Sequence, residues 1–446
     1  MKKILWLLLC LICKNFAASA QGCGDFLGTK TLYQAPAEKN TSVPAGYLPV
    51  FINHVGRHGA RHLTKDVESY FAYQLLFAAD STGWLSADGH KLKQMVLALQ
   101  KAENGNTKSI SVEGQLELEG IGERIYENNR NVFDTNPDFN IRTTKEIRTR
   151  QSANAFMLGL NKKLPHPASP EYHNDDTDLR FYDLSPAYKK FENEVDTNEP
   201  KVSFDKQLQI DQISSIFTAR FFKPDFFNKL NTRQKVKFAS DIFGFATIVY
   251  SIQAEINKAG MNMPDVDFKS FFSCDQLKGF STSDSADEYL KKGPGTDNNG
   301  IQVRVAVPLL VDFIKTTDQF IASGKLNVQL RFAHAETIAP FAALLQIAGA
   351  DGASNNISTI EKIWQSSEVI PLSSNIQWVF YKKQGSDEYL VKILLNEKKV
   401  RISGLVADKN LPYYHWKDMR AFYIKKLTLL NVGLTDDMNK YLTDLK

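Results

Sequence analysis

Cysteine, long apolar runs and surplus charge are all scarce in this sequence of 446 residues. Four cysteines are too few for a small domain held together by disulfides. The formal net charge is +4, so the chain lacks the basic surplus that nucleic-acid binding requires. With 43% hydrophobic residues, it can nevertheless form the core of one large or two ordinary domains. We therefore expect a globular protein whose partner is a small molecule.

A single marked apolar run lies at the N-terminus and is too short to span a bilayer. Lys2 and Lys3 precede this run, Ile4 to Ile12, and the small residues Ala18-Ser19-Ala20 follow it. This order predicts a secretory signal peptide, residues 1–20, that is cleaved after its last residue. We expect a secreted or periplasmic protein with no membrane span, and we predict no oligomeric state.

Cleavage would remove Cys10 and Cys13 and leave Cys23 and Cys274. In an oxidising compartment the two remaining cysteines could form a disulfide. A lipid anchor on Cys23 is the less favoured alternative, because the preceding Ala20-Gln21-Gly22 matches a lipoprotein cleavage site poorly.

The order of the predicted elements indicates an α/β core that a helical segment interrupts. Residues 21–165 form the first part of the core, residues 166–290 read as amphipathic helices, and residues 291–446 return to strands and helices. This order predicts a mostly parallel sheet flanked by helices, with an inserted α-helical cap domain. Two apolar stretches, 376–382 and 389–395, are separated by Gln-Gly-Ser-Asp, which predicts a hairpin.

An apolar strand predicted at residues 49–54 runs into a glycine-bracketed loop that contains Arg57, His58 and Arg61. Strand ends are where α/β folds place their functional residues. Guanidinium groups bind phosphate oxygens in pairs and keep their charge, and a neutral imidazole between them can attack phosphorus. The loop therefore predicts phosphoryl transfer, which depends mainly on positioning and charge stabilisation. The alternative for the two arginines is a pair of surface salt bridges.

His54, His58 and His62 recur every four residues, a spacing that would align metal ligands on one face of a helix. Gly56 and Gly59 disfavour a helix by about 1 kcal/mol each, and the His-Glu-x-x-His pattern of zinc hydrolases is absent. We therefore predict neither a metal site nor a cofactor.

Two motifs resemble those of one known family. Arg57-His58-Gly59-Ala60-Arg61 matches the Arg-His-Gly-x-Arg signature of the histidine acid phosphatases. His334-Ala335-Glu336 resembles the proton-donor motif of their multiple inositol polyphosphate phosphatase (phytase) branch. Residues 148–156 are similar to the helix that carries a third phosphate-binding arginine. The resemblance implies the histidine phosphatase fold, but Leu63 stands where the family usually has proline, which puts the rigidity of the loop in doubt.

The resemblance implies a role for each residue of the two motifs. His58 would attack the phosphate and Glu336 would protonate the leaving oxygen. The residues implied to hold the phosphate are Arg57, Arg61, Arg148 and His334. Because the helix dipole favours an ionised Glu336, its acid role requires a raised pKa, from burial or from neighbouring phosphates. We therefore expect activity that reaches into acidic pH; the alternative is a helix cap without a catalytic role.

The resemblance also implies an inositol polyphosphate as substrate, with phosphates removed stepwise through a phosphohistidine. Such a substrate needs cations beyond the scissile phosphate. The candidates for this specificity pocket are Arg180, Lys65, Lys189, Lys291 and Lys292. For any one of these lysines the alternative is a solvated surface position.

Two other functions compete with this interpretation. A broad-specificity histidine acid phosphatase would act on small phosphomonoesters with the same residues. A non-catalytic phosphate-binding protein would need the arginines but neither a nucleophile nor an acid, so the presence of His58 and Glu336 argues against it.

Overall fold

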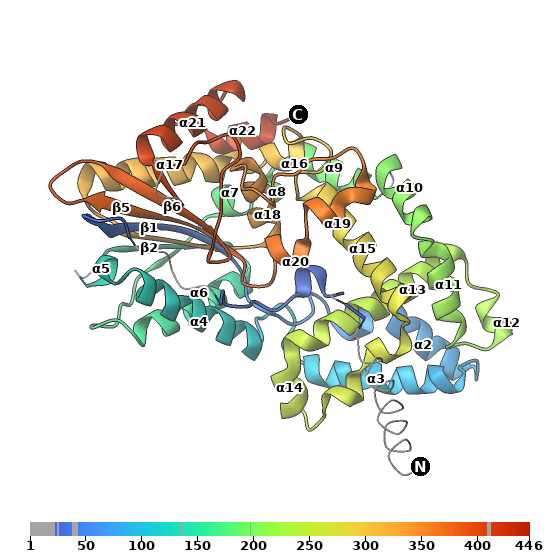
Figure 1. The fold of residues 1–446 in the computed structure, drawn as a ribbon. Coiled ribbons are helices and arrows are strands. Elements are labelled where there is room, and N and C mark those ends of the chain that lie inside the picture. Colours follow the sequence, from blue (N-terminus) through green and yellow to red (C-terminus); the bar gives the residue numbers. More distant parts are fainter. Residues whose placement is uncertain (1–22, 25, 38–42, 135–136, 197, 408–411) are drawn as a thin grey trace, which may run out of the picture.

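The computed structural model describes residues 23–24, 26–37, 43–134, 137–196, 198–407 and 412–446. The predicted signal peptide lies outside these residues. Figure 1 shows a sheet with helices on both faces and a helical body beside it.

The described residues form an eight-stranded mixed sheet in the order β3-β2-β4-β1-β5-β6-β7, with β8 paired to β6. The strands are β1 (Tyr47–Arg57), β2 (Phe139–Thr143), β3 (Tyr172–Asn174), β4 (Val328–Ala333), β5 (Asn375–Lys383), β6 (Tyr389–Leu395), β7 (Lys398–Lys399) and β8 (Tyr413–His415). The half from β3 to β1 is parallel, whereas β5 joins β1 antiparallel and forms the predicted hairpin with β6. The predicted α/β fold is confirmed.

Helices cover both faces of the sheet because its central strands are buried on both sides (Figure 1). One face carries α17 (Val307–Ser323), α18 (Ala335–Leu344), α21 (Trp416–Leu429) and α22 (Met438–Asp444). The other face carries α4 (Val112–Asn128), α5 (Arg130–Phe133) and α6 (Ile147–Asn161).

The helical body has its own hydrophobic cluster, rich in phenylalanine rings that stack on one another. It contains α2 (Phe71–Ser81), α3 (Ala87–Glu103), α11 (Ile210–Ala219), α13 (Thr232–Ile248), α14 (Gln253–Lys258) and the first half of α15 (Cys274–Lys291). The predicted boundaries of the cap, residues 166–290, stay a prediction. Because α2 and α3 share this cluster, we propose that the cap also includes these two helices from the first part of the chain.

Short helices connect the sheet, the helices that cover it and the helical body. They are α7 (Asp176–Leu179), α8 (Phe181–Leu184), α9 (Pro186–Val195), α10 (Glu199–Gln207), α12 (Pro224–Phe227), α16 (Ile301–Arg304), α19 (Ile360–Ile363) and α20 (Ser366–Val369). Single 3₁₀ turns are η1 (Gly28–Lys30), η2 (Val67–Ser69), η3 (Val249–Ile252), η4 (Met263–Val266), η5 (Phe268–Phe271) and η6 (Ile357–Thr359).

A disulfide joins Cys23 to Cys274, a pairing that the sequence left open. It links the segment before β1 to the first residue of α15. Because the Cys23 sulfur is bound to Cys274, it is not free to carry a lipid. In the described part of the chain, no helix has the length and apolar character needed to cross a membrane.

Candidate active site

The parallel pairing of β1 and β4 brings the two predicted motifs together. Arg57, the last residue of β1, lies opposite Ala333, the last residue of β4. The backbone N–H of His58 donates to the Ala333 carbonyl at 3.0 Å, and the His58 and His334 ring centroids lie 5.6 Å apart. Parallel strands end at the same edge of a sheet, so the residues after β1 and β4 share one site.

His58 is held in the tautomer that a nucleophile needs. Its Nδ1 lies 2.9 Å from the Gly59 carbonyl oxygen, which can only accept, so Nδ1 carries the hydrogen. Within the described part of the chain, no hydrogen bond engages Nε2, whose lone pair is therefore available. Burial and the nearby charges of Arg57 and Arg148 lower the pKa of His58 well below its usual value. The imidazole thus stays neutral in acidic solution.

Arg57 and Arg61 are anchored by their Nη1 atoms. Arg57 donates to the carbonyls of Thr29 at 2.7 Å and Ile370 at 2.6 Å. Arg61 donates to the carbonyl of His62 at 2.7 Å. Neutral carbonyls fix these side chains without neutralising them, so both retain their full charge toward a ligand.

Arg148 reaches the same place from α6. It lies in the first turn of this helix, which begins one residue earlier. Its Nη1 donates to Glu146 at 2.9 Å and its Nη2 to Nδ1 of His334 at 3.2 Å. Arg148 is therefore oriented from both sides of its guanidinium group.

Arg57, Arg61 and Arg148 share one unusual feature. Each has a buried Nε with no hydrogen-bond partner among the described residues. Buried donors are normally satisfied, so each such atom requires an explanation. An anion with several oxygens, bound in front of His58, would engage guanidinium groups that the protein itself leaves partly unsatisfied.

The loop after β1 is rigid although it lacks the expected proline. The backbone N–H of Leu63 donates to both carboxylate oxygens of Glu103 at 3.2 Å, a bond that proline could not form. Gly59 packs so closely on α4 that an added Cβ would lie 2.6 Å from the Gly114 carbonyl oxygen. Hydrogen bonds from α3 and close backbone packing therefore replace the ring of proline.

His62 anchors this loop to the helical body. Its Nδ1 lies 3.1 Å from Glu103 and its Nε2 lies 3.6 Å from Glu255 of α14. Burial alone would lower the pKa of His62, but its bonds to the two carboxylates outweigh burial and raise the pKa to about 9. His62 is therefore a buried cation rather than a metal ligand at neutral pH. No group of three or more potential metal-binding side chains is found among the described residues.

The raised pKa of His62 predicts a loss of stability at high pH. A raised pKa in the folded state stabilises the protein below the unfolded value of about 6.5, and this contribution disappears as pH rises through about 9. We expect His62→Gln to destabilise the protein by on the order of 2–3 kcal/mol more at pH 6 than at pH 10. Urea unfolding at both pH values measures the difference, with His90→Gln, an exposed imidazole, as control. Equal destabilisation at both pH values would contradict the raised pKa.

His334 is bound through both ring nitrogens. Arg148 can only donate, so Nδ1 accepts, and Nε2 donates to the Thr144 hydroxyl at 2.9 Å. Burial and the Arg148 charge lower the pKa of His334 to about 3. The structure thus places His334 beside His58 as predicted, where it orients Arg148. Direct contact between His334 and a phosphate stays a prediction.

Glu336 lies in the first turn of α18 with 31% of its side chain exposed. Its Oε1 forms an ion pair with Lys292 at 3.0 Å. Burial raises the pKa of Glu336, but the charge of Lys292 outweighs burial and holds the pKa well below its usual value. The raised pKa that we expected from burial is therefore wrong for this arrangement, which favours the carboxylate.

Two of the five predicted specificity residues lie in contact with site residues. Lys292 pairs with Glu336 and, at 2.7 Å, with Glu288. Arg180 pairs with Glu146, the residue that also holds Arg148. Both cations therefore border the proposed phosphate site.

The other three predicted cations bind elsewhere. Lys291 pairs with Asp196 at 2.8 Å and with Asp287 at 2.9 Å. Lys189 is half exposed and 3.9 Å from Asp183, and Lys65 lies over the Tyr70 ring at 4.1 Å. The partners of these three lysines do not include His58, Glu336 or the arginines, so the structure does not bring them into the site.

Lys30 is a cation of this region that the sequence analysis missed. Burial and the neighbouring charges of Arg61 and Arg57 lower the pKa of Lys30 to about 8. Lys30 therefore lies close to these two arginines. It belongs to η1, in the segment that precedes β1. The disulfide of Cys23 and the bond from Arg57 to Thr29 hold that segment against the site.

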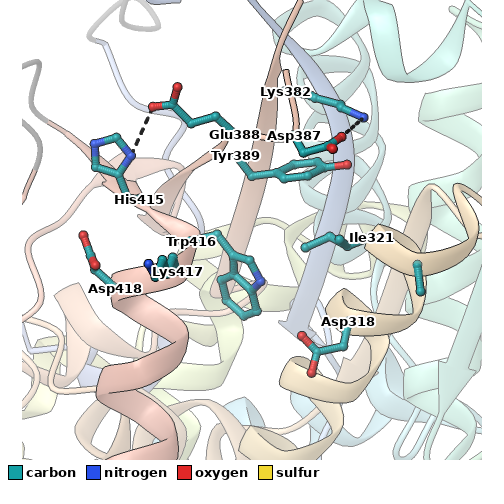
Figure 2. A pocket seen from close by; sticks show the side chains of 11 residues that line it. Asp318, Ile321, Lys382, Asp387, Glu388, Tyr389, His415, Trp416, Lys417 and Asp418 are labelled. Atoms are coloured by element: carbon teal, nitrogen blue, oxygen red, sulfur yellow. Dashed lines mark ion pairs between the residues drawn. The ribbon is translucent and has the colours of Figure 1, made fainter. Parts of the chain in front are cut away.

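A different hollow of about 810 Å³ lies at the other end of β1 (Figure 2). It is lined by residues of the β5–β6 hairpin, α17 and the start of α21, including Lys382, Tyr389, Trp416 and Asp318. Lys382 pairs with Leu48 near the start of β1, so this hollow and His58 are separated by most of an 11-residue strand. None of the predicted site residues lines it.

Comparisons with known proteins agree with this geometry. The structure of multiple inositol polyphosphate phosphatase from Bifidobacterium longum in complex with inositol hexasulfate is similar over 89% of this chain and 97% of that chain, with a TM-score of 0.74 and 21% identity. The phytase from D. castellii is similar over 94% and 91%, with a TM-score of 0.63 and 15% identity. None of the curated protein sequences compared matches this chain.

At these identities the similar structures establish the fold, and the sequence profile of a family establishes the relationship. The profile of the histidine phosphatase superfamily (branch 2) matches residues 50–396, which contain both motifs and most of the sheet. This protein therefore belongs to branch 2 of the histidine phosphatase superfamily.

Proposed function

We propose that this protein is a phosphomonoesterase that removes phosphates stepwise from inositol polyphosphates, phytate among them, through a phosphohistidine on His58. The observation that carries the proposal is the arrangement of three partly unsatisfied arginines around a neutral histidine whose Nε2 is available. Binding alone would not require such a histidine.

The first chemical step is attack of His58 Nε2 on phosphorus. The bond from Nε2 to phosphorus forms while the ester bond breaks, and Arg57, Arg61 and Arg148 balance the charge on the phosphoryl oxygens. The Gly59 carbonyl accepts from Nδ1, which stabilises the positive charge that develops on the imidazole. The low pKa of His58 keeps the nucleophile neutral in acid.

Glu336 supplies the proton for the leaving oxygen. An inositol alkoxide is a poor leaving group, so a positioned acid contributes roughly 10²–10⁴-fold. In the second step, the resulting Glu336 carboxylate accepts a proton from water as the water attacks the phosphohistidine. Phosphate is released and both residues return to their starting states.

The substrate class is supported by cations beyond the three arginines. Lys30, Lys292 and Arg180 border the site, and cations in these positions can bind the further phosphates of a substrate that carries several. The similar protein from Bifidobacterium longum was solved in complex with inositol hexasulfate, a ring with six sulfate groups. The similar protein from D. castellii is a phytase.

Relative rates on phytate and on small phosphomonoesters test the proposal against the broad-specificity alternative. We expect kcat/KM for phytate to exceed that for glycerol phosphate by roughly 10-fold or more at low salt, because several phosphates meet several cations. The advantage should fall as salt concentration rises. Equal values for the two substrates would favour the broad-specificity phosphatase, and no release from either would contradict both functions.

The proposal includes secretion or a periplasmic location. It rests on the order of charge, apolar run and small residues in the first 20 residues and fits the disulfide of Cys23 and Cys274. N-terminal sequencing of the mature protein should begin at Gln21.

A further inference from the structure

Lys292 lies between two carboxylates at the site. Its Nζ is 2.7 Å from Glu288 and 3.0 Å from Glu336, and its side chain is only 11% exposed. Glu288 lies one turn earlier, in α15, whereas Glu336 belongs to α18. The ammonium group therefore connects the end of α15 to the proposed proton donor.

This ion pair conflicts with the role of Glu336 as an acid. A carboxylate paired with an ammonium group favours its ionised form, and an ionised carboxylate has no proton to give. Glu336 must therefore be released from Lys292 before it can protonate a leaving oxygen. Since Glu336 is 31% exposed, solvent water can supply the proton once the ion pair is broken.

We propose that Lys292 keeps Glu336 unprotonated until a second phosphate of the substrate binds the ammonium group, so that only polyphosphorylated substrates load the proton donor. Lys292 is then a positioning residue that selects the substrate through Glu336. This inference rests on the proposed function and adds to it the origin of the preference for several phosphates.

The geometry favours a second phosphate as the trigger. The scissile phosphate is engaged by the three arginines, so a monophosphate leaves the pair of Lys292 and Glu336 intact. A phosphate on a neighbouring ring carbon brings about two negative charges, which compete with Glu336 for Lys292. The same charges favour the neutral acid form of Glu336. Binding of the second phosphate to Lys292 thus allows Glu336 to act as an acid at the scissile bond.

Other charges around Glu336 do not replace Lys292. Those that act on Glu336, on Lys292 or on both are Arg57 at the end of β1, Arg61 in the loop that follows, Tyr182 of α8, Tyr188 and Glu192 of α9, Asp284 and Glu288 of α15 and His334 before α18. Lys292 is the cation that forms an ion pair with Glu336, at 3.0 Å. When Lys292 leaves Glu336 to bind a substrate phosphate, the protonation of Glu336 therefore changes more than it would through any of the other charges.

The pH dependence of the unmodified protein provides the first test. The alkaline limb of kcat should lie at higher pH with phytate than with glycerol phosphate, because only phytate releases Glu336 from Lys292. With p-nitrophenyl phosphate, whose leaving group needs no proton, this limb should be weak or absent. Coincident alkaline limbs for phytate and glycerol phosphate would overturn the inference.

The variant Lys292→Met provides the second test. Without the ammonium group, we expect kcat for glycerol phosphate to rise about 3- to 10-fold near neutral pH, with an alkaline limb at higher pH. We expect KM for phytate to rise about 10-fold, and kcat for p-nitrophenyl phosphate to change little. Lys292→Arg, which keeps the charge, should behave like the parent protein.

Lys278→Met is the matched control. This exposed lysine lies on the same helix, 14 residues earlier, which is roughly 20 Å along the helix axis, and it should leave all three profiles unchanged. A uniform loss of kcat on all three substrates in Lys292→Met would show that Lys292 is structural and would overturn the inference. Failure of the proposed function itself would appear separately, as no phosphate release from phytate by the parent protein.

Discussion

Replacing His58 with alanine is expected to lower kcat for phytate by about 10⁴-fold or more, because the covalent route loses its nucleophile. Binding should change little, since Arg57 and Arg148 are held by Thr29, Ile370, Glu146 and His334 rather than by the His58 ring. Phosphate release and the affinity for inositol hexasulfate, a non-hydrolysed analogue of phytate, measure the two effects. Turnover that persists in this variant would contradict the phosphohistidine route.

The hydrogen bond from Nδ1 to the Gly59 carbonyl also predicts which nitrogen of His58 is phosphorylated. A phosphoryl group should appear on Nε2 of His58, because Nδ1 already donates to the Gly59 carbonyl. Labelled substrate mixed with enzyme and quenched in alkali, in which phosphohistidine survives, should leave label on the Nε2 isomer. His90→Ala, which removes an exposed imidazole, should label normally, and His58→Ala should not label. Label on Nδ1 would show that the ring is oriented differently during the reaction.

Patterns within a few consecutive residues predicted those strands and turns that depend mainly on neighbouring residues. An apolar run correctly placed β1, and a polar tetrapeptide placed the hairpin of β5 and β6. The resemblance of the two motifs to one family implied that His58 and His334 share a site, and the parallel pairing of β1 and β4 brings them together. The strand and the hairpin needed no knowledge of tertiary contacts.

The parts that the sequence did not predict depend on contacts between distant residues. Lys291 and Lys292 are adjacent and chemically identical, yet only Lys292 contacts Glu336, because the end of α15 directs one side chain toward α18 and the other toward Asp196. The rigidity of the loop at Leu63 comes from Glu103, 40 residues away. Neither periodicity nor motif spacing contains this information.

The pKa of Glu336 shows how one such contact changes a functional expectation. Burial, which can be anticipated from an apolar strand and helix, acts in the expected direction and raises the pKa. The opposing charge of Lys292 comes from a helix that ends 45 residues or so earlier in the chain, and it decides the sign. The ion pair with Lys292, more than burial, therefore determines whether Glu336 is protonated when the reaction begins.

Replacing Glu336 with glutamine should slow phytate hydrolysis about 10²–10⁴-fold, because the amide fills the same space but cannot donate a proton to the inositol oxygen. The rate with p-nitrophenyl phosphate, whose leaving group is stable without a proton, should fall far less, by about 10-fold at most. Plotting log kcat against leaving-group pKa for a series of aryl and alkyl phosphates should give a steeper negative slope in Glu336→Gln than in the parent protein.

The pH profile of this variant gives an independent check. If Glu336 is the acid, the parent protein loses kcat for phytate as pH rises through the pKa of Glu336 in the complex, whereas Glu336→Gln has no such group and should lose that alkaline limb. Glu127→Gln is the matched control, because it removes a surface carboxylate that pairs with Lys163 and leaves both Glu336 and Lys292 in place, so its leaving-group slope should match the parent slope. Equal slowing of phytate and p-nitrophenyl phosphate in Glu336→Gln would remove Glu336 from the acid role and leave it as a structural partner of Lys292.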